Sequence, residues 1–471
     1  MSFHPLGLRA KLVLIFVFIK VVPLVLLAWL AWSAALHLGE TLQTRAAGMA
    51  DNMVGTIRQV GDKVTRDAIA ALDDRSREAI ERLTTDTAKN VASFLYDRDA
   101  DVLLAAKLPP QEATVQAFLN NRTRLHCSHG AWKLASNGKE WEPVEKIGTE
   151  PQKAADPAKA LPDNAKAFHA RAPEYSGKCT SKPLYTEISF IDIRGHEQIK
   201  VVSGDLMPRE RHDVTQQANT FVKAENYWPK FKQLKPGEIY VSDVIGAYVG
   251  SHVIGTYTPD AAKKANIAFE PEKSAYAGTE NPVGRRFRGI VRWASPVVKQ
   301  GKIIGYVTLA LDHDHIRQFT DRIVPTDSRY TPIIDAIDGN YAFIWDHNSR
   351  AIAHPRDYMI PGFDPVSGKE IVPWLDEETY KAWKNSRLEW TDFSHTLKPF
   401  NGQSLTRKPA PEMLRAGTLG LDCRYLNFSP QCAGWNQLTE KGGSGSFEIL
   451  FSGLRKLTTA AAIPYYTGQY G

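Results

Sequence analysis

Cysteine is scarce in this sequence: four occur among 471 residues, and no two are spaced as CxxC or CxxCH. That spacing argues against a zinc ribbon and a c-type haem site. The phosphate-binding pattern GxxxxGK(S/T), the nucleophile elbow GxSxG and the zinc-protease pattern HExxH are also absent from the sequence. The net charge of +6 is small and spread along the chain. We therefore expect no catalytic residue, no cofactor and no nucleic-acid partner.

A long apolar run is present near the N-terminus. Residues 12–36 are interrupted by one lysine and one proline, and they are numerous enough to cross a bilayer as a helix. Arg9 and Lys11 precede the run, and the first lysine or arginine after its end is Arg45. Because cytoplasmic flanks are enriched in basic residues, we expect residues 1–11 in the cytoplasm and the main domain outside the plasma membrane of a bacterium, in the periplasm or extracellular space. A cleaved signal peptide is the alternative, but its apolar region spans only about 7–15 residues.

An extracytoplasmic location permits disulfides. Cys423 and Cys432 are close enough in sequence to close a small loop, and Cys127 and Cys179 could close a longer one. Four cysteines allow three pairings, among which the sequence does not choose. The alternative is four free buried thiols.

Residues 38–106 are predicted to form one long helix, which ends before Pro109 and Pro110. Apolar residues recur at steps of three and four, which is a near-heptad spacing. The stripe begins with Leu42, Ala46, Met49, Met53, Ile57, Val60 and Val64. This pattern favours a stalk and a homodimer seam. The alternative is a helix that packs only on its own domain.

Beyond a polar, irregular stretch at 110–180, the chain alternates between strand patterns and turns. The expected strands are 184–193, 198–204, 237–244, 287–298 and 302–316, with a helical connection at about 207–233. A similar order then restarts with a short helix at 315–324, a hairpin at 341–355, a helix at 376–385 and two strands within 444–466. Antiparallel strands with segregated helices indicate an α+β fold.

The order of these segments resembles the double Cache sensor domain of bacterial transmembrane receptors. The resemblance covers about residues 90–471 and rests on IDIRG, EIYVSDV, ASPVVKQGKIIGYVTLALD and FIWDHNSRAIAHP. It implies two PAS-like antiparallel sheets, a membrane-distal one at 107–322 and a membrane-proximal one at 323–471. The second sheet lacks a last long strand, and no second membrane span follows. We therefore expect a fragment of a longer receptor whose effector, most often a histidine kinase, is missing.

The resemblance also implies a ligand pocket in the membrane-distal sheet. The candidate residues are Tyr227, Trp228, Tyr240, Ser242, Asp243, Arg288, Arg292, Trp293 and Asp312. Arginine can grip a carboxylate with two hydrogen bonds, and aromatic rings can line the pocket. Each residue has a plainer alternative as core or as a solvated charge. The Arg-x-Trp-Tyr of amino-acid-binding members is missing, because this chain reads AENYWPKFKQL there. This difference argues against an amino acid as the ligand, and an organic acid that binds through its carboxylate is still compatible with the sequence.

Two Asp/His runs invite a metal-site interpretation, which we do not adopt. In Asp312 to His315, strand alternation would put the two aspartates on one face and the two histidines, His313 and His315, on the other, so the ligands would not converge. The run at Asp346, His347 and His354 lies in a hairpin whose turn residues favour solvent.

The sequence therefore predicts a membrane-anchored sensor that transmits a small-molecule signal across the membrane. The alternatives are an anchored adhesive surface protein and a periplasmic metal-dependent hydrolase that uses the Asp/His runs.

Overall fold

The computed structural model describes residues 7–128, 130–144, 179–321, 341–397, 408–423, 431–439, 441–451 and 454–470. The chain divides into two compact units, Met1–Arg75 and Ser76–Gly471. Helix α2 (Val22–Ala105) belongs in part to each of them.

The first unit is helical. Helix α1 (Leu8–Phe16) passes through a π-helical turn, Val17–Val21, into α2. The turn lies directly before Pro23, which has no backbone N–H to donate to the preceding turn, and a π-turn is a known way to accommodate such a gap. The segment Leu8–Ala34 is long and apolar enough to cross a membrane, by length and composition. The side chains of the predicted stripe from Leu42 to Val64 lie outside the described part.

The predicted long helix is confirmed, since α2 ends at Ala105, shortly before the Pro109–Pro110 pair. Helix α3 (Glu112–Asn121) follows. Two small antiparallel pairs come next, β1 (Thr123–Cys127) with β4 (Cys179–Pro183), and β2 (Trp132–Leu134) with β3 (Trp141–Pro143).

The core of the second unit is one antiparallel sheet in the order β6-β5-β10-β9-β7, with β8 also paired to β9. The strands are β5 (Tyr185–Asp192), β6 (Glu197–Val202), β7 (Tyr240–Val241), β8 (Ile245–Gly246), β9 (Gly289–Lys299) and β10 (Lys302–Asp312). The predicted β9–β10 turn is confirmed: Gln300 and Gly301 both have positive φ, as in a type I′ hairpin turn.

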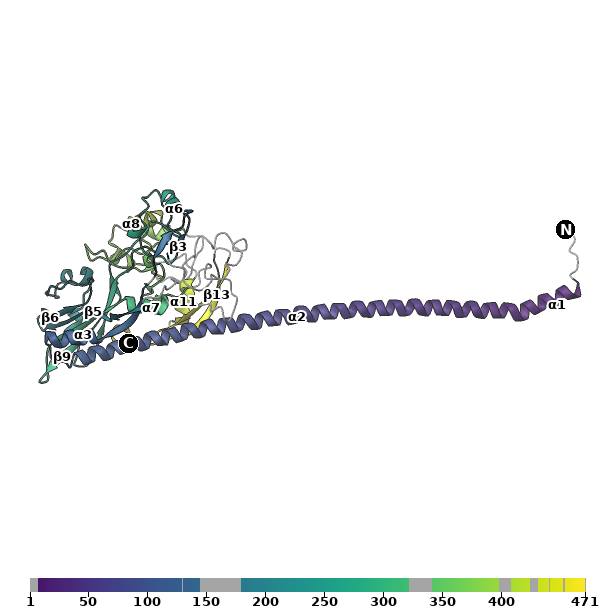
Figure 1. Cartoon of the computed structure of the whole chain (residues 1–471), viewed down its shortest axis with the longest axis horizontal. Helices are drawn as coiled ribbons and strands as arrows, with labels where there is room; N and C mark the ends of the chain where they lie inside the picture. Colours follow the sequence, from purple (N-terminus) through teal and green to yellow (C-terminus); the bar gives the residue numbers. More distant parts are fainter. Residues whose placement is uncertain are drawn as a thin grey trace. The chain divides into compact units, whose positions relative to one another are not determined.

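Both faces of this sheet are covered, so β9 is buried along nearly its whole length and not in alternation. On one face, apolar residues of α2, α3, β5, β9 and β10 share a hydrophobic core. Figure 1 shows α3 and the C-terminal end of α2 beside β5 and β9. The other face is covered by a segment at 206–234, called the covering segment below. It contains the short helix α5 (Trp228–Phe231) and packs through Val214, Phe221, Tyr227 and Phe231.

The rest of the second unit is built from short elements. They are α6 (Pro259–Lys264), α7 (Asp314–Asp321), β11 (Ile344–Trp345), β12 (Ala351–Ala353), α8 (Glu377–Ser386), α9 (Trp390–Ser394), α10 (Pro411–Ala416), α11 (Gln431–Thr439), β13 (Ser444–Phe451) and β14 (Leu454–Ala461). The predicted hairpin at 341–355 and the two strands within 444–466 are confirmed. Within the described residues, however, β11–β12 and β13–β14 are separate two-stranded pairs and are not joined in one sheet.

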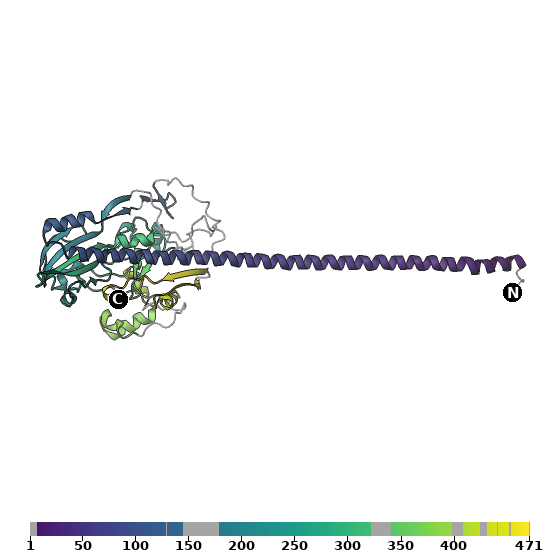
Figure 2. The same cartoon turned by 90° about the horizontal axis from the view of Figure 1, so that it is seen from below.

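The β13–β14 hairpin lies along α2, as both views show (Figure 1 and Figure 2). Thr84 and Thr459 share a hydrogen bond of 2.6 Å, and Arg77 pairs with Glu448 at 3.0 Å. The chain then runs through residues 463–470 to the edge of the six-stranded sheet, where Gly468 lies against Val241. We call residues 463–470 the C-terminal segment.

The four cysteines form two disulfides. Cys127 is joined to Cys179, and Cys423 is joined to Cys432. The first ties β1 to β4, whose backbones pair at these two residues. This is one of the three pairings that the sequence left open.

Candidate functional site

Arg292 is the centre of the strongest polar cluster on the covered face of the sheet. It lies in β9 and is only 2% exposed. Its Nε and Nη2 donate to the two carboxylate oxygens of Glu225 at 2.7 and 3.0 Å, which is a two-bond fork. Its Nη1 donates to Glu187 at 2.7 Å and to Thr308 at 3.2 Å. All of the guanidinium nitrogens are therefore engaged within the protein.

The cluster continues through further buried charges. Lys200 on β6 lies 3.3 Å from Glu187 and 3.0 Å from Glu197. Glu197 also accepts the backbone N–H of His212 in the covering segment at 2.8 Å. Together with Arg292 and Glu225, the cluster holds two cations and three carboxylates, all almost fully buried. If every group is ionised, one negative charge is in excess.

Burial acts differently on two of the carboxyl groups. Burial raises the pKa of Glu225, and the opposing effect of Arg292 does not cancel it. Burial also acts to raise the pKa of Glu187, but Arg292 and Lys200 together outweigh it, so that pKa is lowered. The two carboxylates share one arginine, yet only Glu187 has a second cation. Glu225 is therefore the more weakly held anion of the pair.

The backbone that presents Glu225 is strained. Val222 and Lys223 have φ of 45° and 55°, in the left-handed region. A β-branched residue there is a genuine outlier, and each such residue costs about 1–3 kcal/mol. The hydroxyl oxygen of Thr220 accepts the backbone N–H of Glu225 at 3.1 Å, and its proton faces the carbonyls of Gln217 at 2.7 Å and Glu225 at 3.1 Å. These contacts hold the turn closed.

Five of the nine predicted ligand residues gather around this cluster: Tyr227, Trp228, Tyr240, Ser242 and Arg292. The Tyr227 ring lies 5.1 Å from the guanidinium of Arg292. The Ser242 hydroxyl accepts the backbone N–H of Arg292 at 2.8 Å. Tyr240 packs on Phe231 at 5.2 Å between ring centroids. The space that a ligand would need beside Arg292 is filled by Glu225 and by these rings.

Trp293 is on the opposite face of β9, because neighbouring side chains of a strand alternate. Its indole N–H donates to Asp99 on α2 at 2.8 Å. Asp99 also accepts from Tyr465 at 2.7 Å and from Thr467 at 2.6 Å, both in the C-terminal segment. Trp293 therefore joins the sheet to α2 and to the C-terminal segment and does not line a pocket with Arg292.

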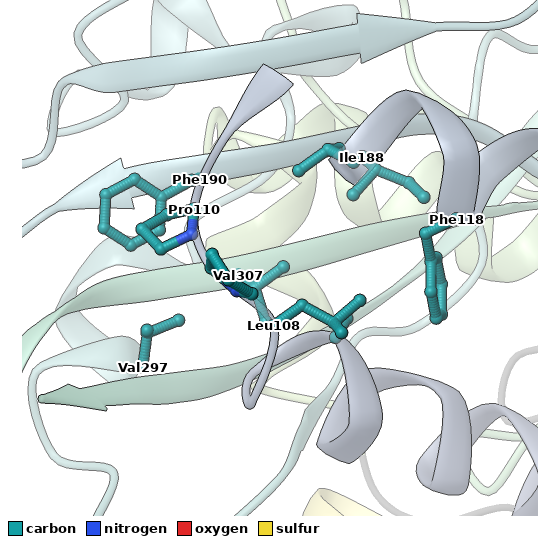
Figure 3. Close-up of a pocket in the computed structure, with 10 residues that line it drawn as sticks. Leu108, Pro110, Phe118, Ile188, Phe190, Val297 and Val307 are labelled. Atoms are coloured by element: carbon teal, nitrogen blue, oxygen red, sulfur yellow. The ribbon is translucent and has the colours of Figure 1, made fainter. Parts of the chain in front are cut away.

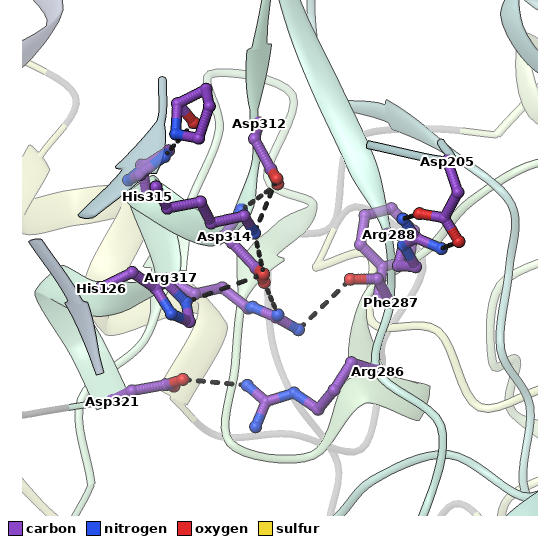
Figure 4. Close-up of polar contacts among 12 residues, drawn as sticks. His126, Asp205, Arg286, Phe287, Arg288, Asp312, Asp314, His315, Arg317 and Asp321 are labelled. Atoms are coloured by element: carbon purple, nitrogen blue, oxygen red, sulfur yellow. Dashed lines mark hydrogen bonds and ion pairs between the residues drawn. The ribbon is translucent and has the colours of Figure 1, made fainter. Parts of the chain in front are cut away.

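The remaining predicted residues are paired elsewhere. Asp243 lies 3.3 Å from Arg350 and accepts from Gln469 at 3.0 Å. Arg288 precedes β9, is largely exposed and pairs with Asp205, with one bond of 3.2 Å (Figure 4). The expected strand at 287–298 begins only at Gly289, so Arg288 lies outside it and does not share a strand face with Arg292.

The expected strand alternation across Asp312 to His315 is also wrong. Strand β10 ends at Asp312 and α7 begins at Asp314, as the expected short helix had indicated. Lys182 lies 2.8 Å from both Asp312 and Asp314, and Asp314 also pairs with Arg317 (Figure 4). The aspartates are therefore counter-ions at the start of a helix.

The two histidines of this run are buried and bonded to backbone. His313 donates through Nε2 to the carbonyl of Ile352 in β12, and His315 donates to the carbonyl of Pro183 at 2.9 Å. Burial lowers the pKa of His313 to about 3 and that of His315 to about 4. Both rings are therefore neutral near pH 7.

The second Asp/His run behaves as a hairpin turn. Asp346 accepts the backbone N–H groups of Asn348 and Arg350 at 2.9 Å each, as a turn-forming aspartate does. The Nδ1 of buried His354 accepts the N–H of Arg356 at 3.0 Å, and exposed His347 packs on Tyr470. Over the described ranges, no group of three or more His, Cys, Asp or Glu side chains could hold a metal ion.

A small cavity lies on the α2 face of the sheet, away from Arg292. It has a volume of about 20 Å³, enough for about one water molecule. Its lining is apolar and includes Leu108, Pro110, Phe118, Ile188, Phe190, Val297 and Val307 (Figure 3). With no polar group to orient a ligand, this cavity reads as a packing gap where α2 turns into α3.

The sequence prediction missed three residues that organise the site: Glu187, Glu225 and Asp99. Glu187 carried a signal, because a carboxylate inside the apolar strand LYTEISFIDI must find a cation if both faces are covered. Glu225 and Asp99 stand in polar stretches and carried none.

The solved structures with a distant likeness to this chain include two domains of other proteins. One is the extracellular domain of a protein described as the histidine kinase vpHK1S-Z8, with a TM-score of 0.21, 13% identity, and coverage of 38% of this chain and 47% of that chain. The other is a domain of a protein described as sensory box/GGDEF family, from Vibrio parahaemolyticus, with a TM-score of 0.21, 14% identity, and coverage of 38% and 50%. The chain thus spans about half the length of each. No family model and no curated protein matches it. Neither likeness is close enough to indicate a function for this chain.

Proposed function

We propose that the chain is a membrane-anchored extracytoplasmic sensor of the double Cache kind. In this proposal Leu8–Ala34 is the anchor, and a small molecule binds at the covered face of the sheet. The signal passes through α2, in a homodimer, to an effector such as a histidine kinase in the cytoplasm. The apolar helix and the two disulfides support an extracytoplasmic location.

The observation that carries the proposal is the pair of neighbours Arg292 and Trp293. Arg292 binds the covering segment through Glu225 on one face, and Trp293 binds Asp99 of α2 on the other. A change in how the covering segment sits on Arg292 therefore has a direct route through β9 to α2. A ligand that favours one arrangement of the segment shifts the equilibrium by at most the difference between its binding free energies for the two arrangements, and the coupling through β9 carries that shift to α2.

Coupling across the sheet is testable by hydrogen exchange in the full chain. Glu225→Gln keeps the shape of the side chain but removes its charge, and it should speed exchange in residues 220–231. We expect exchange in 91–105 and 463–470 to speed up as well, by about tenfold if about 1.4 kcal/mol of local stability is lost. In a chain that already carries Asp99→Asn, Glu225→Gln should no longer change the exchange rates of these two regions.

Glu280→Gln is the matched control. Arg356 and Glu280 form a second buried two-bond fork, at 2.8 and 3.0 Å, and neither residue lies in a strand of the main sheet. If Glu280→Gln accelerates exchange in 91–105 as much as Glu225→Gln does, the effect is general loosening and the proposed route is wrong.

The proposed orientation is tested by cysteine labelling in intact cells. Gly7→Cys and Ser367→Cys each place one new thiol at an exposed position, while the four native cysteines are paired. A membrane-impermeant maleimide should label the variant at 367 and not the variant at 7. Labelling at 7 before lysis would contradict the orientation.

A further inference from the structure

The fork between Glu225 and Arg292 has the geometry that arginine offers to a carboxylate ligand. Two parallel N–H groups face two oxygens, at 2.7 and 3.0 Å, at a buried position walled by Tyr227. Arginine is used in this way wherever planar recognition of a carboxylate is needed. Here the protein supplies the carboxylate itself.

The segment that positions Glu225 has a strained backbone, and contacts with residues 366–368 hold it in place. The left-handed residues Val222 and Lys223 lie just before it. Lys223 donates from Nζ to the carbonyl of Val366 at 3.0 Å, and its backbone packs so closely on Gly368 that a Cβ there would lie 2.3 Å from the Lys223 carbonyl oxygen. The other buried fork differs in this respect, because the left-handed residue near Glu280 is Gly278, which bears no such strain.

The charge of the cluster restricts what could replace Glu225. The cluster holds Arg292 and Lys200 against Glu187, Glu197 and Glu225. Exchanging one carboxylate for another leaves this buried charge unchanged. An uncharged ligand in place of Glu225 would leave Arg292 with one carboxylate fewer. A cationic ligand would compete with Arg292 for Glu187.

We infer that Glu225 is an internal stand-in for the carboxylate of a small ligand, and that Phe221–Glu225 is the segment which leaves Arg292 when that ligand binds. The inference rests on the proposed sensor function and names its ligand class. Departure of the segment relaxes Val222 and Lys223 and breaks the contact of Lys223 with Val366. Val366 lies four residues before Glu370, whose carboxylate is 3.5 Å from the guanidinium of Arg350.

The test is calorimetric titration of the full chain in detergent with acetate, succinate and benzoate, and with acetamide, succinamide and benzamide as uncharged counterparts. Glu225→Gln removes the competing anion without changing side-chain shape, so at least one carboxylate should bind about tenfold more tightly than to the wild type. Val222→Gly relieves the strain of the closed segment, so the same carboxylate should bind more weakly. Glu280→Gln, the matched fork, should leave the affinity unchanged.

Each outcome decides the inference. Tighter binding to Glu225→Gln with no binding of the amides supports it. Equal binding of acid and amide, or no carboxylate binding to a folded Glu225→Gln variant, overturns it. Should that variant fail to fold, weaker carboxylate binding to Val222→Gly supports the inference, and unchanged binding or no binding to the wild type overturns it. A compound without a carboxylate that raises the melting temperature of the wild type in a saturable way would overturn this inference and leave the sensor function standing.

Discussion

Arg292→Leu is expected to lower the free energy of unfolding by about 3–5 kcal/mol, the range seen when one partner of a buried ion pair is removed. Without Arg292, Lys200 still pairs with Glu187 and Glu197, but Glu225 loses its cation. Leucine fills much of the space, so the loss comes from uncompensated buried charge and not from a cavity. Part of it should return when Glu225→Leu is added, because the second change removes an unpaired carboxylate.

The measurement is urea unfolding of the full chain in detergent, with disulfides intact, followed by tryptophan fluorescence. Arg288→Leu is the matched control: it changes the same residue type four positions earlier, where the side chain is exposed and pairs with exposed Asp205. Exposed ion pairs contribute little, so its midpoint should move far less. Equal shifts for the two variants would show that the Arg292 cluster is not a buried charge network.

Acidification from pH 7.5 to 5 is expected to destabilise the protein through His313 and His315. Burial holds the pKa of these rings at about 3 and about 4, whereas an unfolded histidine titrates near its ordinary value of about 6.5. The stability due to their neutral burial is complete above the unfolded pKa and is lost as pH falls toward the folded pKa. At pH 5 the unfolded state binds both protons and the folded state binds neither, which costs about 2 kcal/mol for each ring.

The check is the same unfolding experiment at pH 7.5, 6 and 5. His313→Gln retains an N–H donor for the carbonyl of Ile352 and cannot titrate. Burial also lowers the pKa of His354, so three rings contribute and this variant should remove about a third of the pH dependence due to histidines. His347→Gln changes an exposed ring and should leave the dependence as in the wild type. If His313→Gln leaves the slope unchanged, His313 is not protonated on unfolding in this range.

Secondary structure was predictable where periodicity or turn chemistry was strong. The long helix, the helix stop near Pro109 and the turn at Gln300–Gly301 follow from local rules and agree with the structure. The end of β10 was misplaced, because LALDHDHI continues a strand-like pattern. The structure begins α7 at Asp314, where Lys182 and Arg317 hold the aspartate.

The candidate site was predictable in part. Tyr227, Trp228 and Tyr240 lie near Arg292, whereas Arg288 and Trp293 do not join them. The sequence could not show that Arg292 is already bound to Glu225, since the two residues are 67 positions apart. Nor could it show that Trp293 faces Asp99. A strand that is covered on both faces lacks polar–apolar alternation, so its sequence does not tell which side chains point toward α2.

By itself, the sequence determined the apolar N-terminal helix, its continuation into a long helix, the α+β class and most strands of the main sheet. These depend on spacing within a few residues, which local physics resolves. Only the tertiary structure decided which cysteines pair, which face of β9 packs on α2, and that the guanidinium of Arg292 is bound by the carboxylate of Glu225. Those outcomes depend on contacts between distant segments, whose energies are set by burial and by the partners that burial brings together.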